Sequence, residues 1–238
     1  MRNKIDFSWV KPGYVIGDQE ANEILNKFEG GFKIEEVVTI DGRKLEYVIN
    51  KTMMRIDLKK PLKSKSKTSI SIRWSYNIQD RIFMGGRPGY EFFEADSNYL
   101  YTICQWFPRM AKYNDVYGWQ NKQFLGRGEF TLDFGDYDVR ITVPADHIVA
   151  ATGELQNSME VLTKTQIDRM KQAKSSKEPV IIITQDEAAI NEKSRSKQVK
   201  TWRFKAKDVR DFAFTSSRKF IWDAMGVKFG NRTVMAMS

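Results

Sequence analysis

The stretch TSISIRWSYNI, residues 68–78, constrains the fold more than any other part of the chain. Its large side chains, from Ile70 to Ile78, alternate with small or polar ones, from Ser69 to Asn77. A period of two places every apolar group on one side of a strand and leaves the other side to water. Strands covered on one side only are typical of antiparallel sheets, because parallel sheets are buried on both faces. The stretch therefore predicts an antiparallel β fold.

Other short strand-like runs recur along the chain. Asp41-Gly42 separates two of them, and it suits a tight hairpin because glycine tolerates positive φ. We predict further strands at 52–58, 129–134, 137–143, 148–155, 179–184, 200–206, 211–216 and 234–238. Short strands with frequent turns favour a sandwich over alternating strands and helices. The predicted fold class is mainly β, an antiparallel, saddle-like β-sandwich with one or two short helical excursions.

The first of these excursions is the segment 163–174. Thr163 and Gln166 have the spacing of a capping box, and Ile167 and Met170 share one helical face. The segment 186–197 is expected to be a second excursion, either helical or a loop. We find no internal repeat.

The chain carries 39 Lys and Arg against 30 Asp and Glu, a formal net charge of +9. The excess lies in three segments rich in Ser and Lys, 59–67, 171–177 and 193–200, none of which interleaves with aromatic residues as a base-stacking groove does. We therefore predict solvated loops and no nucleic-acid partner. Polyanion binding is a weaker alternative, and it predicts a steep salt dependence.

No apolar run approaches the roughly 20 residues that a membrane-spanning helix needs, so no membrane span is expected. The first 14 residues, MRNKIDFSWVKPGY, also lack the apolar centre of a secretion signal. The compartment stays open between cytoplasmic and periplasmic or secreted.

The chain has one cysteine, Cys104, and one histidine, His147. One cysteine excludes an internal disulfide, and one histidine excludes the zinc motif H-E-x-x-H. Cys104 is expected to be a small apolar filler on a strand. His147 follows Asp146 in a turn and is expected to be hydrogen-bonded or solvent-facing, because it has no nucleophile at a suitable spacing. We predict no catalytic residue, no metal ligand and no cofactor in this chain.

The stretch 84–94, MGGRPGYEFFE, contains three glycines, but no capped amphipathic helix follows it. We therefore expect a mobile or interface loop there and not a phosphate cradle. The segment 113–120 combines Tyr, Asn, Asp, Gly and Trp. It is predicted to be an ordered loop facing another domain. The alternative is a stand-alone β-sandwich that binds carbohydrate or protein through this aromatic loop.

The stretch QWFPRM, residues 105–110, follows directly on a strand-like run. Trp106 and Phe107 beside Pro108 indicate a corner where a strand leaves its sheet, with the two rings filling the space between two sheets. Gln105 is expected to be a strand-end amide bonded to the backbone, unless a ligand uses it.

Three segments in this order, 105–110, 137–155 and 200–214, resemble the amino-terminal β-domain of zinc metallopeptidases of the aminopeptidase N and leukotriene A4 hydrolase type (gluzincin aminopeptidases), in particular the bacterial branch. The family has a W-F-P segment after a strand, then a V-x-V-x-V-P strand with a glycine-containing turn, then an aromatic-rich strand. The matching residues are Trp106, Phe107 and Pro108; Val139, Ile141, Val143 and Pro144 with Ala151, Thr152 and Gly153; and Trp202, Phe204, Val209, Asp211, Phe212 and Ala213.

The resemblance implies that the corner at 105–110 faces a catalytic domain of the same protein and a peptide substrate. In the family a Glu or Gln before W-F-P recognises the substrate's free amino group, and Gln105 is the residue that can take this role here. An amide oxygen accepts a hydrogen bond from an ammonium group less strongly than a carboxylate does. Zinc belongs to the intact family enzyme.

The sequence departs from the family in two places. The catalytic motifs H-E-x-x-H and G-x-M-E-N occur nowhere in it, and residues 1–32 are short and irregular for the family's first strands. The resemblance therefore implies a partial chain. We expect an irregular segment at 1–32, a β-sandwich domain at 33–215, and a linker with the start of a catalytic domain at 216–238. Alone, this chain is expected to be a non-catalytic module that walls the substrate cleft of an aminopeptidase.

Overall fold

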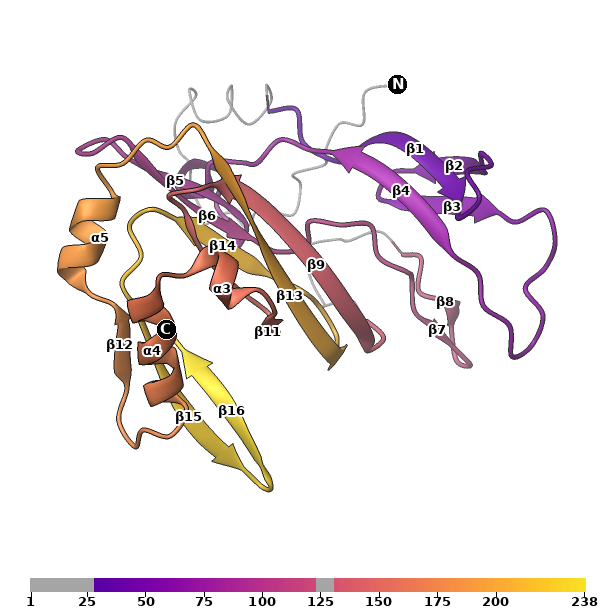
Figure 1. Cartoon of the computed structure of the whole chain (residues 1–238). Coiled ribbons are helices and arrows are strands. Elements are labelled where there is room, and N and C mark those ends of the chain that lie inside the picture. The colour runs from indigo at the N-terminus through magenta and orange to yellow at the C-terminus, as the bar shows by residue number, and fades with distance from the viewer. Residues whose placement is uncertain (1–27, 123–130) are drawn as a thin grey trace. The chain divides into compact units, whose positions relative to one another are not determined.

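The computed structural model describes residues 28–122 and 131–238, and these divide into two compact units. Unit 1 comprises 28–79, 109–122 and 131–132, and unit 2 comprises 80–108 and 133–238. Every ladder between named strands of the described residues is antiparallel, which confirms the predicted fold class. Figure 1 shows the elements of both units.

Unit 1 consists of three two-stranded sheets. They pair β1 (Lys33–Thr39) with β4 (Ile70–Ser75), β2 (Glu46–Asn50) with β3 (Met53–Asp57), and β7 (Tyr113–Asn114) with β8 (Gly118–Trp119). The alternating stretch that predicted the fold class is β4. Its apolar residues are half-buried and its polar ones are exposed, as the period of two requires.

The turn at Asp41-Gly42 is tight, with Gly42 at φ 83° and the Thr39 amide donating to the Arg43 carbonyl at 2.9 Å. The hairpin that it closes is short, because only Val38 and Lys44 form a bridge beyond the turn. Strand β2 then pairs along its whole length with β3. The hairpin prediction is thus confirmed at the turn, while the long ladder forms with the next strand.

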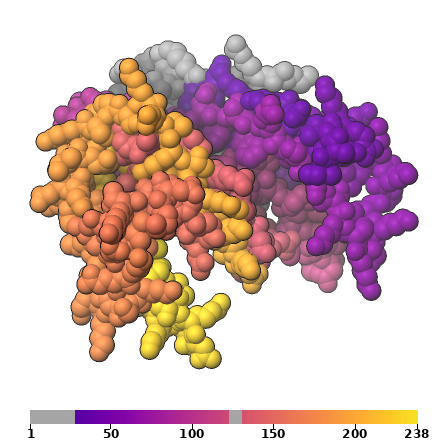
Figure 2. Space-filling view, in the orientation of Figure 1, coloured from indigo at the N-terminus to yellow at the C-terminus, as the bar shows by residue number. Residues whose placement is uncertain are grey.

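Unit 2 contains three larger sheets. The first has the order β10-β14-β6-β5, the second β11-β13-β9 and the third β12-β15-β16. Their strands are β5 (Gly89–Phe93), β6 (Asn98–Ile103), β9 (Gly135–Pro144), β10 (Ile148–Ala151), β11 (Glu154–Leu155), β12 (Val180–Ile183), β13 (Val199–Val209), β14 (Phe214–Ser217), β15 (Trp222–Phe229) and β16 (Arg232–Met237). The far end of the β15–β16 hairpin, yellow in Figure 2, projects from the rest of the unit. Its exposed residues include Phe229.

Four short helices accompany these strands in the described residues: α2 (Arg81–Met84), α3 (Ser158–Val161), α4 (Lys164–Ala173) and α5 (Gln185–Asn191). The predicted helix at 163–174 is α4, and Thr163 and Gln166 form the predicted capping box. Thr184 and Glu187 form a second box at the start of α5, within the expected second excursion. No helix in the described ranges is long and apolar enough to cross a membrane.

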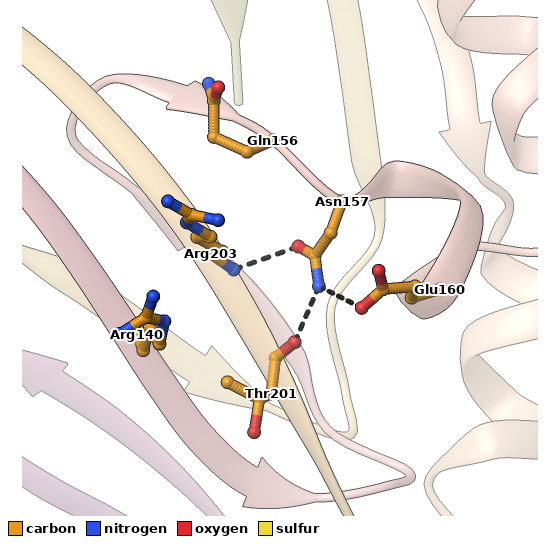
Figure 3. Close-up of a pocket in the computed structure, with 6 residues that line it drawn as sticks. All are labelled: Arg140, Gln156, Asn157, Glu160, Thr201 and Arg203. Atoms are coloured by element: carbon orange, nitrogen blue, oxygen red, sulfur yellow. Dashed lines mark hydrogen bonds between the residues drawn. The ribbon is translucent and has the colours of Figure 1, made fainter.

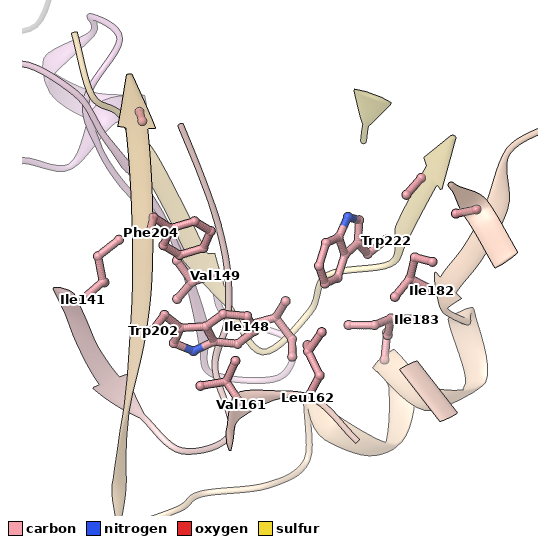
Figure 4. Packing of buried hydrophobic residues seen from close by; sticks show 14 of the residues in the cluster. Ile141, Ile148, Val149, Val161, Leu162, Ile182, Ile183, Trp202, Phe204 and Trp222 are labelled. Atoms are coloured by element: carbon pink, nitrogen blue, oxygen red, sulfur yellow. The ribbon is translucent and has the colours of Figure 1, made fainter. Parts of the chain in front are cut away.

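One continuous hydrophobic cluster lies in unit 2 (Figure 4). Strand β13 supplies its centre, because Trp202, Phe204 and Ala206 point inward while the residues between them point outward. Trp202 and Phe212 are fully buried. Ile182 and Trp222 bring the third sheet into the same cluster. The strand predicted at 200–206 therefore lines the hydrophobic core with its inward-facing residues.

Two local predictions were wrong. The stretch 84–94 is not simply a loop, because residues 89–93 form β5 and pair with β6. The glycines before the aromatic residues suggested a loop. In the structure, Tyr90 and Phe92 pair across the ladder with Tyr101 and Tyr99 of β6. The strand expected at 129–134 is also not found, since 131–134 is irregular and residues 129 and 130 lie outside the described residues.

Candidate functional site

The outward face of β9 and β13 carries three cross-strand pairs of polar residues: Thr142 with Thr201, Arg140 with Arg203, and Asp138 with Lys205. The hydroxyl groups of Thr142 and Thr201 form a hydrogen bond, with their oxygens 2.8 Å apart. Beside them, Arg140 lies opposite Arg203. Two like charges directly opposite each other in a sheet repel, so this pair needs anions nearby.

The side chain of Asn157 forms hydrogen bonds with backbone groups of β13, as a neighbouring strand would. Its Oδ1 accepts from the Arg203 backbone amide at 2.9 Å, and its Nδ2 donates to the Thr201 carbonyl at 2.9 Å. The same amide group donates to Glu160 Oε2 at 2.9 Å. The Gln156 backbone amide donates to the Arg203 carbonyl at 2.8 Å. The connection from β11 to α3 is therefore held against β13 by hydrogen bonds to the backbone of β13, which come from the Asn157 side chain and the Gln156 amide.

These groups border a hollow of about 310 Å³, shown in Figure 3. Its lining residues are Arg140, Gln156, Asn157, Glu160, Thr201 and Arg203. Sequence reasoning missed this site. The alternation in the two strands indicates which side chains point outward, but only the register of β13 on β9 places the two arginines together.

The two guanidinium groups differ in their partners. Arg203 donates from Nε and Nη2 to the two oxygens of Asp138, at 3.2 and 2.9 Å. These hydrogen bonds lower the pKa of Asp138 and raise the pKa of Arg203. Arg140 has no hydrogen bond or ion pair within the described ranges. One cation of the pair is thus neutralised, and the other is open to solvent.

Gln105, the predicted site residue, lies two positions beyond the end of β6. Its side chain is exposed and makes no hydrogen bond to any described part of the chain. Its backbone has φ 53°, in the left-handed region that costs a non-glycine residue free energy. The amide is not used by the fold of unit 2, so the expectation of a backbone-bonded amide does not hold.

The corner beside Gln105 has the predicted form. Trp106 donates from Nε1 to the Phe212 carbonyl at 3.0 Å, and its ring meets Phe214 edge-on with centroids 5.7 Å apart. The ring of Phe107 meets Tyr137 at 5.8 Å in the same manner. Phe214 belongs to the first sheet of unit 2 and Tyr137 to the second, so the two rings fill the space between sheets.

His147 is buried, with 3% of its surface exposed, and its Nδ1 lies 2.8 Å from Ser216 Oγ. Burial lowers the pKa of His147 to about 4, and nearby Arg218 acts in the same direction. The Asp146 carboxylate pairs with Arg218 Nε at 3.0 Å and not with the imidazole. A nucleophile and base without an orienting acid and without access to solvent do not form a hydrolytic triad. The expected role, a hydrogen-bonded histidine, is confirmed.

The Asp146 carboxylate is itself held by several donors. Burial acts to raise its pKa, but the ion pair with Arg218 and the hydrogen bonds from Ser196 and Ser194 hold the pKa below its ordinary value. The ion pair between Asp146 and Arg218 therefore connects the turn before β10 to the segment that follows β14.

The described residues contain no group of three or more His, Cys, Asp and Glu side chains placed to hold a metal ion. A zinc site needs three or four such ligands. The described residues thus offer no such set of ligands for zinc. Cys104 lies half-buried just beyond β6.

The segment 113–120 forms the small β7–β8 hairpin. Asn114 Oδ1 accepts from the backbone amides of Val116 and Tyr117, at 3.1 and 2.8 Å, which fixes the turn. The rings of Tyr113 and Trp119 meet edge-on with centroids 5.3 Å apart, and both are exposed. The segment is a hairpin, and it presents aromatic surface to solvent. That it faces another domain stays a prediction.

No protein-family model and no curated protein matches the sequence. Among solved structures, the chain is similar to an M1 zinc metallopeptidase from Deinococcus radiodurans, with 14% identity and a TM-score of 0.44. It is also similar to a mutant two-domain M1 zinc metallopeptidase bound to L-tryptophan, with 13% identity and a TM-score of 0.44. Each match covers 87% of this chain and 37% of the other chain.

Proposed function

We propose that this chain is the non-catalytic amino-terminal β-module of a zinc-dependent aminopeptidase, and that it walls the cleft in which peptides lose their first residue. The observation that supports this most is the convergence of three sequence segments on one corner of unit 2. Trp106 donates a hydrogen bond to the Phe212 carbonyl and meets the Phe214 ring edge-on, and Phe107 meets the Tyr137 ring edge-on. The three segments that carry the family resemblance thus meet at this corner.

In this proposal Gln105 recognises the ammonium group of the substrate. Its exposed amide is unused by the described part of the chain, and its backbone is held in the left-handed region. Strain at a non-glycine residue supports a functional hypothesis, because the fold gains nothing visible from it. Zinc, in the proposal, is held by the catalytic domain of the same protein, where it polarises the scissile carbonyl and activates water.

The first test uses the purified chain with an aminoacyl p-nitroanilide substrate and added zinc. We expect no turnover, and no zinc retained in equilibrium dialysis. Turnover that a chelator abolishes would contradict the assignment of a non-catalytic module.

The second test examines the coding region and then the intact protein. The reading frame is expected to carry an H-E-x-x-H sequence beyond the present residues, and a frame without one would refute the proposal. In the zinc-containing protein, Gln105→Ala is expected to raise KM for a free-amino peptide about tenfold, and Gln105→Glu to lower it, because the acceptor strength changes. Gln172→Ala, an exposed amide on α4, is the control and should change neither constant.

A second candidate function rests on the β7–β8 hairpin. Tyr113, Tyr117 and Trp119 are exposed by 58%, 73% and 56%, and flat rings of this kind stack on ligands. This favours a stand-alone β-sandwich that binds carbohydrate or protein. Binding on a glycan array that is lost with Trp119→Ala supports this candidate, whereas binding that Trp119→Ala leaves unchanged contradicts it.

A further inference from the structure

We propose that the hollow between Arg140, Gln156 and Arg203 binds a carboxylate group, with Arg140 as its principal cation. This site is separate from the corner at Gln105, and it is independent of the aminopeptidase proposal. The ligand chemistry is a single carboxylate, carried either by the end of a peptide or by a small organic acid.

The argument begins with the unequal use of the two guanidinium groups. Arg203 uses Nε and Nη2 on Asp138, which leaves Nη1 as a donor. Arg140, directly opposite on β9, has all five of its N–H donors uncommitted within the described residues. Guanidinium groups match the planar geometry of a carboxylate with paired hydrogen bonds. The two groups therefore offer a fork and an additional donor to one ligand.

Three polar side chains that line the hollow are held in place by hydrogen bonds within the fold. Asn157 is held by hydrogen bonds to both the amide and carbonyl side of β13, and Gln156 donates from Nε2 to the Glu154 carbonyl at 2.8 Å. Thr201 is fixed by its bond to Thr142. These side chains are positioned by the fold and do not have to be ordered by the ligand.

The charge around the hollow selects the kind of anion. Three cations, Arg140, Arg203 and Lys205, face two carboxylates, Asp138 and Glu160, so one positive charge remains. A singly charged carboxylate neutralises this excess. A phosphate dianion carries one negative charge more than this excess, and the Glu160 carboxylate that lines the hollow repels it. The structure therefore favours a carboxylate over a phosphate group.

The test measures binding to the whole chain, labelled with ¹⁵N, by NMR titration. The probes are N-acetyl-Ala-Ala with a free carboxylate, its C-terminal amide, sodium propionate and inorganic phosphate. The signals to follow are the Arg140 side-chain Nε–H and the backbone amides of Asn157 and Arg203. We expect shifts with the free peptide acid or propionate, and none with the amide. Tighter binding of the peptide acid than of propionate identifies a peptide end, and the reverse identifies a free acid.

Three variants sharpen the assignment. Arg140→Gln is expected to weaken carboxylate binding about tenfold, since it removes a charge-assisted pair of hydrogen bonds. Glu160→Gln keeps an acceptor for Asn157 but removes a repelling charge, so binding should tighten about threefold. Arg232→Gln removes an exposed charge from β16 and should leave binding unchanged.

The proposal is overturned by any of three results: shifts that are equal for the acid and the amide, Arg140→Gln binding as tightly as the original chain, or phosphate binding more tightly than every carboxylate. All of the variant positions are exposed, and the dispersed NMR spectrum of each variant checks that its fold is intact.

Discussion

Units 1 and 2 both consist of antiparallel strands with alternating side chains, but they bury these side chains to different extents. In unit 2, Trp202 and Phe212 are fully buried and belong to a cluster that three sheets share. In unit 1, every residue of β2 is exposed, and β4 buries its apolar face only in part. An alternating pattern therefore fixes which face of a strand is apolar, but a second layer is needed before that face stabilises the fold.

The largest expected effect contrasts a tryptophan of each unit. Trp202→Ala removes the centre of the unit 2 cluster and should lower the free energy of unfolding by about 3–5 kcal/mol, whereas Trp74→Ala, at a half-buried position of β4, should cost about 1–2 kcal/mol. Amide hydrogen exchange within each unit measures both. Trp202→Phe is the control, and it should cost less because the indole N–H has no partner in the described residues. Equal losses for the two alanine variants would show that the units are equally well packed.

The next largest effect is the response of unit 2 to mild acid, because the chain's one histidine lies there. The folded pKa of His147 is about 4, below the unfolded value of 6.5, with Arg218, Asp146 and Lys200 as its charged neighbours. The unfolded state thus binds the proton first, and unit 2 should lose about 3 kcal/mol of stability as the pH falls from 6.5 to 4.

The measurement is denaturation of unit 2 at a series of pH values. His147→Asn retains an acceptor for Ser216 and should flatten this part of the profile, while the acid response of Asp146 remains. A profile that is unchanged by His147→Asn would refute the role of the imidazole.

A smaller difference, about 2 kcal/mol, is expected between one glycine in each unit, since both have positive φ. A Cβ at Gly153, with φ +90°, would lie 2.3 Å from the Lys205 carbonyl oxygen, whereas a Cβ at Gly42, with φ +83°, meets nothing within 4 Å. Gly153→Ala should therefore cost about 3 kcal/mol through strain and displacement of β11 from β13, and Gly42→Ala about 1 kcal/mol through strain alone. Thermal denaturation of the two variants decides this, and a larger loss for Gly42→Ala is the contrary outcome.

The smallest effect concerns the exposed β2–β3 hairpin of unit 1. Ile49 is 43% exposed, so Ile49→Ser should change the free energy of unfolding by no more than about 0.5 kcal/mol. Ile182→Ser, at a fully buried position of β12, is the matched change in unit 2 and should unfold its surroundings. A large loss with Ile49→Ser would reveal a covering layer over β2.

The sequence by itself determined the antiparallel β class, the α4 helix with its capping box, the turn at Gly42 and the aromatic corner at Trp106. These follow from interactions between residues that are close in the chain, namely the period of two, the spacing of cap and acceptor, and the freedom of glycine. Gln105 was proposed as a site residue from a motif, and its strained, unbonded state became visible only in the structure.

Only the tertiary structure decided which strands pair and which outward residues meet. The register of β13 on β9 places Arg140 opposite Arg203, although 63 positions separate them. A shift of β13 by one residue would turn Arg203 to the other face of the sheet and separate the two arginines. Similarly, β2 pairs with β3, and the glycine-rich stretch before Phe93 contains a strand because β6 offers it a partner. Pairing energy comes from contacts that are distant in sequence, so local patterns do not encode it.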